Sequence, residues 1–392
     1  MPDEKHLETV PVGPLGIICM ESCHSLGDKV NKYIVNWRKH RTGLITHSVS
    51  YTGYQKDSYL IDAQVPRFGS GEAKGIINET IRGDDLYILV DVGNYSMTYS
   101  LCGFANHMSP DDHFQDLKRI IAAAGGKARR INVIMPFLYE SRQHKRTRRE
   151  SLDCAIALQE LTAMGVENII TFDAHDPRVQ NAIPLKGFET VQPGYQFIKG
   201  LLREVKDLKI DSRHMMVISP DEGGTSRAVY LANVLGLDMG MFYKRRDYAT
   251  IVDGRNPIVA HEFLGSDVEG MDVIVIDDMI SSGESVLEVA RELKKRKVNR
   301  VFVAATFGLF TGGLDKFDKA YEEGLIDKIL TTNLTYQTPE LLSKPYYIDC
   351  DMSKYIALII DTLNHDATMS DLLNPVNRIH RLVSRYKGEK EQ

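Results

Sequence analysis

Short runs of apolar residues alternate along the chain with longer stretches that have helical periodicity. The apolar runs begin at Leu15, Leu86, Ile131, Asn168, Met215, Asp272 and Val301. Continuous apolar runs that are rich in β-branched residues are typical of strands covered on both faces. The helical stretches begin at His113, Ser151, Ser226 and Glu284. This alternation predicts a mainly parallel α/β architecture, in which ligands bind beyond the carboxyl ends of the strands.

One pattern, a buried strand that ends in acidic residues, occurs twice. ITFDAHD contains Asp173, and IVIDDM contains Asp277. We therefore predict two stacked α/β domains, one over residues 14–205 and the other over residues 206–385. The predicted boundary lies near the polar stretch from Lys206 to Ser212.

The composition is that of an ordinary globular protein. Hydrophobic residues make up 43% of the 392 residues, and 30 Gly with 14 Pro exclude a collagen-like or largely disordered chain. The 48 Lys and Arg residues are outnumbered by 53 Asp and Glu residues, which gives a net charge of −5. Because proteins dedicated to nucleic acid usually carry a broad basic face, this balance argues against a nucleic-acid partner.

Five cysteines are too few and too scattered for a disulfide framework, which indicates a reducing compartment. Cys19 and Cys23 have no second cluster with the spacing of metal ligands, and we interpret them as ordinary thiols. The stretch MPDEKHLETVPVG lacks the apolar segment of a signal peptide. No run reaches the roughly 20 apolar residues that a membrane helix needs. We expect a cytoplasmic protein with no membrane partner.

The most informative stretch runs from Val273 to Ser285 as VIVIDDMISSGES. It combines a buried strand, two adjacent acids and a hydroxyl-rich turn that enters a helix. Backbone N–H groups at a helix start and nearby hydroxyl groups bind phosphate oxygens, and glycine lets the backbone approach closely. The turn therefore predicts a phosphomonoester site, formed by Ser281, Ser282, Gly283 and Ser285.

The two acids of this stretch predict a second chemical group on the same ligand. Asp277 and Asp278 cannot attract a phosphate, but they can accept hydrogen bonds from two vicinal hydroxyl groups of a sugar and help to hold Mg²⁺. Ribose 5-phosphate matches both ends of the pattern. The alternative interpretation is an acidic strand end followed by an N-capping serine and an ordinary helix.

This stretch resembles the loop that binds phosphoribosyl diphosphate (PRPP) in type I phosphoribosyltransferases and in ribose-phosphate diphosphokinases. Further motifs similar to those of the diphosphokinases, or PRPP synthetases, occur in the same order and begin at Arg67 (RFGSGEAKG), Met135 (MPFLYESRQHKR), Thr171 (TFDAHDPRVQ), Ser219 (SPDEGGTSRA) and Lys244 (KRR). The resemblance extends from Leu15 to about Leu372. It implies two type I phosphoribosyltransferase-like domains, each with a mainly parallel sheet flanked by helices.

The resemblance also implies a role for residues of each motif. The implied ATP contacts are Phe68, Ser70, Glu72, Arg142 and Gln143. The implied Mg²⁺ ligands are His175 and Asp221, and we expect Asp173 to orient His175. The implied catalytic residues are Lys244 and Arg246. The implied ribose 5-phosphate contacts are Asp277, Asp278, Ser281, Ser282, Gly283 and Ser285.

The reaction that the resemblance implies is attack by the 1-hydroxyl of ribose 5-phosphate on the β-phosphorus of Mg-ATP, which gives PRPP and AMP. No covalent enzyme intermediate forms, so the protein must align the substrates and neutralise the charge of the moving diphosphate. The family forms homo-oligomers, commonly hexamers built from dimers. The stretch from Trp37 to Tyr54 and the region after Tyr336 make the chain longer than typical members, and we interpret the first as an insertion.

Other interpretations stay open. A type I phosphoribosyltransferase would consume PRPP, although the motifs at Arg67 and Met135 argue against it. A catalytically weak regulatory homologue would associate with an active synthetase, but the chain retains Lys244, Arg246, Asp221 and His175. The stretch from Arg142 to Arg149 has five basic residues in eight, which is also typical of a solvated helix start or a nucleic-acid patch.

Several residues differ from the usual family pattern. Ser70 replaces an Asp or Asn, Ser281 replaces an Asp, and Phe307 replaces the His of a THG stretch. Glu284 occupies a loop position that is usually small. A carboxylate there would repel a bound phosphate unless it points outward from the helix start.

Overall fold

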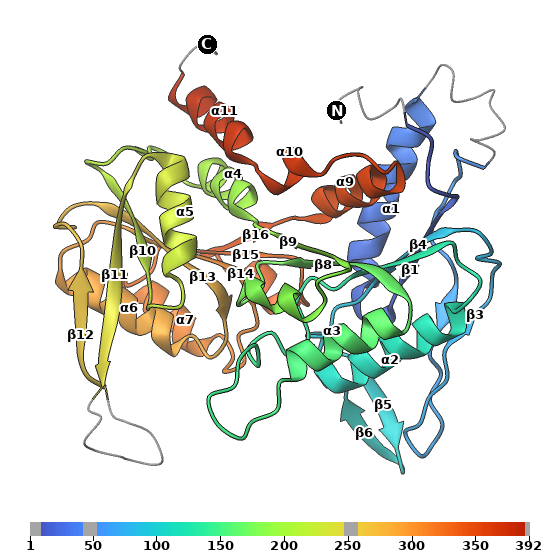
Figure 1. Ribbon diagram of the computed structural model, residues 1–392. Helices are drawn as coiled ribbons and strands as arrows, with labels where there is room; N and C mark the ends of the chain where they lie inside the picture. The colour runs from blue at the N-terminus through green and yellow to red at the C-terminus, as the bar shows by residue number, and fades with distance from the viewer. Residues whose placement is uncertain (1–8, 42–52, 247–257, 389–392) are drawn as a thin grey trace. The chain divides into compact units, whose positions relative to one another are not determined.

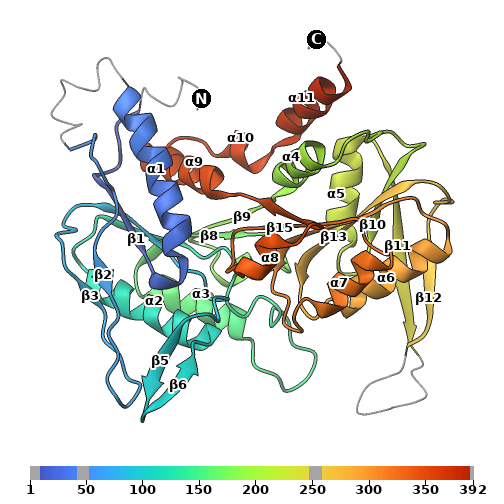
Figure 2. The same cartoon turned by 180° about the vertical axis from the view of Figure 1, so that it is seen from behind.

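The computed structural model describes residues 9–41, 53–246 and 258–388, and for 244–246 and 258–261 it describes the backbone alone. The chain forms two compact units (Figures 1 and 2). Unit 1 extends to Gln192 and also contains Asn333–Tyr336 and Asp351–Asn374. Unit 2 consists of Pro193–Thr332, Gln337–Cys350 and the chain from Pro375 onward.

A five-stranded parallel sheet in the order β1-β4-β7-β8-β9 forms the centre of unit 1. Its strands are β1 (Leu15–Cys19), β4 (Asp85–Leu89), β7 (Arg130–Ile134), β8 (Val166–Phe172) and β9 (Gly187–Val191). Two antiparallel pairs lie outside it, β2 (Ala63–Gln64) with β3 (Ile76–Ile77) and β5 (Thr98–Leu101) with β6 (Phe104–His107). Every residue of β4 is buried, as predicted for a strand covered on both faces.

Helices cover both faces of the unit 1 sheet. α2 (Pro110–Ala124) and α3 (Asp153–Ala163) lie on one face, and α1 (His24–His40) lies with α9 (Ser353–Asn364) on the other (Figures 1 and 2). The short elements are η2 (Glu21–Cys23), η5 (Pro177–Ala182) and α10 (Ser370–Leu373). α2 begins with a capping box, in which Ser109 and Asp112 exchange hydrogen bonds with each other's backbone N–H groups.

Unit 2 contains a seven-stranded sheet in the order β12-β11-β10-β13-β14-β15-β16, parallel except for the edge strand β12. The strands are β10 (Met215–Ser219), β11 (Asp238–Arg246), β12 (Ile258–Leu264), β13 (Asp272–Ile280), β14 (Val301–Gly308), β15 (Lys328–Thr332) and β16 (Tyr347–Cys350). The helices are α4 (Gly194–Glu204), α5 (Thr225–Leu235), α6 (Glu284–Lys295), α7 (Asp315–Glu322), α8 (Pro339–Ser343) and α11 (Val376–Lys387).

Alternate residues of β13 belong to two hydrophobic cores, one on each face of this sheet. Val273 and Val275 pack with residues of α6 and α7, whereas Ile274 and Ile276 pack with residues of α4 and α5. The chain leaves β10 toward β11 and later returns to β13 on the other side of β10. This reversal is the topological switch point at which open α/β sheets bind ligands.

The two units differ from the predicted ranges 14–205 and 206–385 in three segments, of which the shortest, Asn333–Tyr336, belongs to unit 1. Helix α4 lies in unit 2 because its residues Phe197 and Leu201 are buried in a core of the unit 2 sheet. The segment Asp351–Asn374 returns to unit 1, where α9 packs against α1. Neither helix was among the predicted helical stretches, and the core that each one joins depends on contacts between distant segments.

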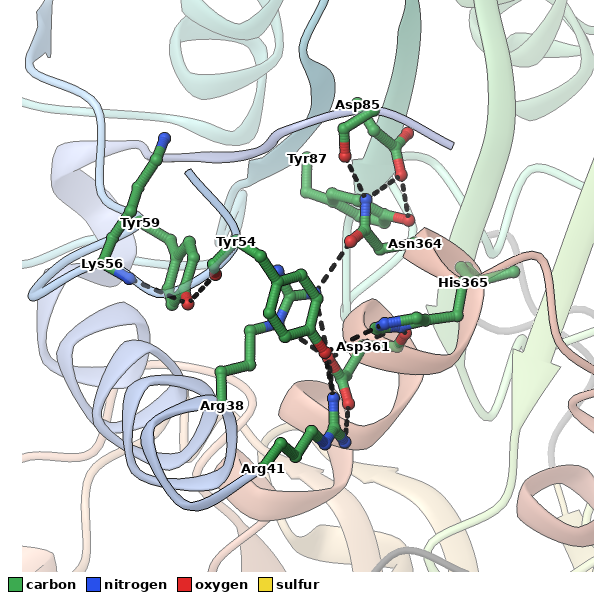
Figure 3. Close-up of polar contacts among 12 residues, drawn as sticks. Arg38, Arg41, Tyr54, Lys56, Tyr59, Asp85, Tyr87, Asp361, Asn364 and His365 are labelled. Carbon is green, nitrogen blue, oxygen red and sulfur yellow. Dashed lines mark hydrogen bonds and ion pairs between the residues drawn. The ribbon is translucent and has the colours of Figure 1, made fainter. Parts of the chain in front are cut away.

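A buried polar network joins α1, α9 and the chain near Tyr54 (Figure 3). The Asp361 carboxylate binds the guanidinium groups of Arg38 and Arg41, and the Tyr54 hydroxyl lies 2.6 Å from Arg41 Nη1 and 3.0 Å from His365 Nε2. Of the predicted insertion, the first residues continue α1 and residues 42–52 lie outside the described ranges. The described ends of that stretch therefore contact Asp361 of α9 and His365, the residue that follows α9.

The helices of the described ranges fall short of what a membrane span requires. None of them combines the length and the apolar character that are needed to cross a bilayer.

Candidate active site

Acidic side chains converge at the switch point of unit 2, where β10 ends beside β13. Asp221 follows β10, and Asp277 lies in the last half of β13. Burial, the neighbouring Asp278 and the charge of Asp221 raise the pKa of Asp277 well above its usual range. Asp221 and Asp277 are more than 50 residues apart in the sequence, and the parallel pairing of β10 with β13 brings their carboxylates together.

The loop after β10 is folded tightly around the side chain of Asp221. Its Oδ1 atom accepts the N–H groups of Gly223 at 2.8 Å and Gly224 at 3.2 Å. A Cβ atom on Gly224 would lie 2.9 Å from Ser219 Oγ, so this position requires glycine. The loop thereby fixes the carboxylate at the start of α5.

Arg227, in the first turn of α5, adds a buried cation to this group of acids. Its Nη2 atom lies 3.8 Å from Asp278 Oδ2, and both side chains are at least nine-tenths buried. Arg227 therefore compensates one of the two adjacent carboxylates, and no local sequence pattern indicates this pairing.

The hydroxyl-rich turn connects β13 to α6, as predicted. Gly283 has φ +80°, and a Cβ atom there would overlap the Phe317 ring. The N-cap residue of the twelve-residue helix α6 is Gly283, which has no side chain to bond the first N–H groups. The serines of this turn therefore lie next to backbone N–H groups that suit an anion.

A second loop, which we did not predict as part of this region, runs beside the serine turn. Thr311 donates its N–H to the Ser281 carbonyl at 3.0 Å, and the two hydroxyl oxygens lie 3.4 Å apart. Phe307, which stands where the family has a histidine, is buried in β14 opposite Met279 of β13. Its ring therefore belongs to the protein interior.

The side chain of Glu284 points outward from the start of α6, toward α7. Its carboxylate binds Lys316 Nζ at 3.0 Å and is 73% exposed. The Lys316 ammonium group lowers the pKa of Glu284. The carboxylate therefore points away from the helix start, which is the direction that a phosphate bound there would require.

Three predicted ATP contacts lie in one tight loop of unit 1, residues 67–72. Phe68 and Glu72 are connected by a backbone hydrogen bond of 2.7 Å, and Ser70 Oγ donates to Glu72 Oε2 at 2.9 Å. The Phe68 side chain is 53% exposed, which is unusual for a phenylalanine. This loop presents an aromatic face and a carboxylate to solvent.

The other predicted ATP contacts follow β7. Arg142 is exposed, whereas Gln143 is held by its Nε2 donor to the Ser151 carbonyl at 2.7 Å. Burial and two nearby acids raise the pKa of Glu140, and the Arg142 guanidinium group offsets part of this rise. The basic side chains from Lys145 to Arg149 are exposed as well, so a cationic surface adjoins Gln143.

The predicted metal ligand His175 follows β8 and lies beside a second imidazole. The rings of His144 and His175 are 5.3 Å apart, and His144 Nε2 lies 3.6 Å from Asp176 Oδ2. The sequence did not indicate His144 as a neighbour. Asp173 has φ +40° and accepts a hydrogen bond from Gln192, and its role in orienting His175 stays a prediction.

The donors present near the switch point fit Mg²⁺. Within the described ranges, no group of three or more His, Cys, Asp and Glu side chains is arranged to hold a metal. Mg²⁺ commonly takes one or two carboxylates and completes its shell with water and substrate phosphates. Asp221 and Asp277 supply such carboxylates, and their mutual repulsion is a cost that a bound cation would remove.

The predicted catalytic residues Lys244 and Arg246 lie at the end of β11, which pairs with β12. Lys244 is opposite His261, and the register shifts between Arg245 and Arg246. Their side chains are outside what the structure describes. Their catalytic role therefore stays a prediction.

Comparisons with known proteins agree with this arrangement. Residues 15–165 match the N-terminal domain of ribose phosphate pyrophosphokinase, and residues 187–334 match the phosphoribosyl transferase domain. The chain is 29% identical over 319 residues to a ribose-phosphate pyrophosphokinase of Vibrio cholerae, which covers 80% of this chain and 92% of the relative. A relative from Pasteurella multocida is 29% identical over 314 residues, with 79% and 90% covered.

A solved structure shows the same fold. The crystal structure of phosphoribosylpyrophosphate synthetase from Mycobacterium smegmatis superimposes with a TM-score of 0.69 at 20% identity, over 90% of this chain and 99% of that one. The predicted architecture of two parallel-sheet α/β domains is thereby confirmed. On these matches and the motifs that carry them, the chain is a distant member of the ribose-phosphate pyrophosphokinase family.

Proposed function

We propose that this protein is a ribose-phosphate diphosphokinase, which transfers the β,γ-diphosphate of Mg-ATP to the 1-hydroxyl of ribose 5-phosphate and releases PRPP and AMP. The observation that carries the proposal is the switch point of unit 2. Two adjacent acids, the half-buried Asp277 and the buried Asp278, precede a serine turn and a helix start whose N-cap is Gly283. This order of groups matches a sugar diol at one end and a phosphomonoester at the other.

In this proposal the residues of unit 2 orient ribose 5-phosphate. Asp277 and Asp278 accept hydrogen bonds from the vicinal hydroxyl groups of the sugar. The N-terminus of α6 holds the 5-phosphate together with the hydroxyl groups of Ser281, Ser282 and Ser285. Fixing both ends of the sugar directs its 1-hydroxyl and converts a bimolecular encounter into a step within one complex.

The residues of unit 1 bind ATP in this proposal. The exposed Phe68 ring offers a face on which an adenine base can stack, and Ser70 and Glu72 lie beside it. Arg142, with Gln143 next to it, supplies positive charge for the triphosphate.

The charge of the moving diphosphate is neutralised by cations. Asp221 would hold Mg²⁺. His175 stays a proposed Mg²⁺ ligand by family resemblance. When bound, this cation screens the phosphate oxygens and favours attack on the β-phosphorus. Lys244 and Arg246 stabilise the transition state electrostatically.

The experiment is to incubate the purified full-length protein with ATP, Mg²⁺ and ribose 5-phosphate, and to measure AMP and PRPP. Formation of both in equal amounts supports the proposal. A Lys244→Ala variant should bind ATP normally but turn over at least about 100-fold more slowly. Normal turnover by that variant would remove the proposed role of Lys244.

The same assay separates the two alternatives. PRPP consumption that depends on an added base, without AMP, identifies a phosphoribosyltransferase. Neither activity, together with binding to an active synthetase, identifies a regulatory homologue. The observation that favours a regulatory homologue is Ser70, which replaces the usual Asp or Asn at a predicted ATP contact.

We place the reaction in the cytoplasm and expect a homo-oligomer, both by family resemblance. All five cysteines are free thiols, which is the state that a reducing compartment maintains. Size-exclusion chromatography with light scattering tests the oligomeric state, and a mass below that of a dimer would contradict the expectation.

A further inference from the structure

No residue of the 67–72 loop is buried. An open pocket of about 490 Å³ adjoins Arg67, and its lining includes Met97, Tyr99, His113, Asp116 and Ile120. A loop without a buried side chain gains little order from hydrophobic packing. Polar contacts must therefore supply the order.

One side chain, Arg67, connects this loop to two other elements. Its Nη1 atom donates to the Gly71 carbonyl at 3.2 Å, which closes the loop across its base. Its Nη2 atom lies 2.8 Å from Asp116 Oδ2 on α2. The guanidinium carbon also lies 4.3 Å from the centre of the Tyr99 ring on β5. Such a planar, forked cation can make all three contacts at once, which an ammonium group cannot.

The hairpin formed by β5 and β6 supports the loop at a second place. Cys102 donates its N–H to the Gly69 carbonyl at 2.9 Å. Gly71, at φ +89°, packs so closely on this hairpin that a Cβ atom would lie 2.7 Å from Leu101 Cδ1. Both contacts fix the loop backbone on either side of Ser70.

We propose that Arg67 is a positioning residue, which with Tyr99 and Asp116 holds the 67–72 loop in the conformation that binds ATP. The proposal rests on the proposed function, because it assigns a role to the loop that presents Phe68 and Glu72. The apparent affinity of a loop for its ligand is proportional to the fraction of molecules in which the loop already has its binding conformation. Arg67 keeps the fraction of molecules with an ordered loop high before ATP binds. It therefore affects the affinity for ATP and not the affinity for ribose 5-phosphate.

Arg119 provides a matched control for this role. It binds the other oxygen of the same carboxylate, with 2.5 Å between Nη1 and Asp116 Oδ1, from within α2. The structure shows no side-chain contact from Arg119 to the 67–72 loop among the hydrogen bonds and ion pairs of the described residues. Arg67→Met and Arg119→Met each remove one cation from Asp116, but only the first releases the loop.

The experiment measures the dissociation constant of ATP with Mg²⁺, in the absence of ribose 5-phosphate, by calorimetric titration of the full chain. Arg67→Met should bind ATP about tenfold more weakly, since a bridging charge-assisted contact is lost. In the steady-state assay its KM for ATP should rise by a similar factor. Its kcat at saturating ATP and its KM for ribose 5-phosphate should change less than about twofold. Arg119→Met should bind ATP as the wild type does.

Two outcomes would overturn the proposal alone, namely equal ATP affinity of Arg67→Met and wild type, or an equal loss in Arg119→Met. A wild-type protein that does not bind ATP would overturn the proposed function as well. The fluorescence of Trp37, the one tryptophan of the chain, reports whether each variant is folded. If Arg67→Met does not fold, Tyr99→Leu removes the ring contact instead, and unchanged ATP affinity in that variant would overturn the proposal.

Discussion

Arg227 and Asp278 come from different elements of unit 2 and face each other inside it, with 3.8 Å between Nη2 and Oδ2. The arginine belongs to the first turn of α5, and the aspartate belongs to β13. Because both side chains are buried, each charge depends on compensation from its surroundings.

Replacing Arg227 by Met should destabilise unit 2. A buried carboxylate would lose a compensating cation, and we expect the free energy of unfolding to fall by about 3 kcal/mol. Differential scanning calorimetry of the full chain at pH 7 measures the effect. The Asp278→Asn change in the same chain should recover part of the loss, because the uncompensated charge is then removed. A double variant less stable than Arg227→Met would contradict this explanation.

Gly283→Ala tests the geometry of the serine turn. The substituted residue would have to keep φ +80°, and its Cβ would overlap the Phe317 ring, so the turn must shift. We expect a loss of about 3 kcal/mol in stability and at least a tenfold increase in KM for ribose 5-phosphate. Gly313→Ala is the control, since its φ is +75° but a Cβ atom there would meet no other atom within 4 Å. That variant should lose only about 1 kcal/mol.

Glu284→Gln should change little. The carboxylate is exposed and binds Lys316 on α7, so we expect its removal to leave the stability essentially unchanged. It points outward from the helix start, so the KM for ribose 5-phosphate should stay within about twofold of wild type. Steady-state kinetics at low salt give the most sensitive test, because salt screens long-range repulsion. A KM that falls tenfold would show that Glu284 repels the bound phosphate after all.

The ion pairs of Asp361 predict how unit 1 responds to acid. Despite its burial, Arg38 and Arg41 lower the pKa of Asp361 to about 2 (Figure 3). The carboxyl group of an unfolded chain titrates near pH 4, so the unfolded state binds the proton first as pH falls. The stabilisation is therefore complete above about pH 4 and is lost between pH 4 and pH 2, and we expect it to amount to about 2 kcal/mol.

Urea unfolding followed by Trp37 fluorescence measures this effect, because Trp37 lies in α1 next to Arg38. The comparison is between wild type and Asp361→Asn at a series of pH values. Their difference in unfolding free energy should be largest near pH 6 and should shrink toward pH 2. A difference that is independent of pH would contradict the proposed linkage.

The serine turn shows how far local sequence can predict a site. The run VIVIDDMISSGES identifies a buried strand, a turn that requires glycine and a helix start, and the structure has each of these between Val273 and Ser285. These features depend on residues that are close together in the chain. The types of these residues determine their backbone preferences and hydrogen-bonding groups.

Other features depend on segments that are far apart in the sequence. The Glu284 carboxylate meets Lys316 of α7, and the buried Asp278 meets Arg227 of α5. The bridge from Arg67 to Tyr99 and Asp116 joins three elements. No periodicity or motif indicates such pairs, because side-chain partners on separate elements are chosen by packing.

The sequence by itself determined that this is a two-domain α/β protein of the ribose-phosphate pyrophosphokinase family, through its apolar runs and ordered motifs. Tertiary structure alone decided that α4 belongs to unit 2 and that Asp351–Asn374 returns to unit 1. It also decided that Asp221 and Asp277 share one end of a sheet. The physical reason is that local preferences specify each strand and helix, whereas burial of their apolar faces selects which elements become neighbours.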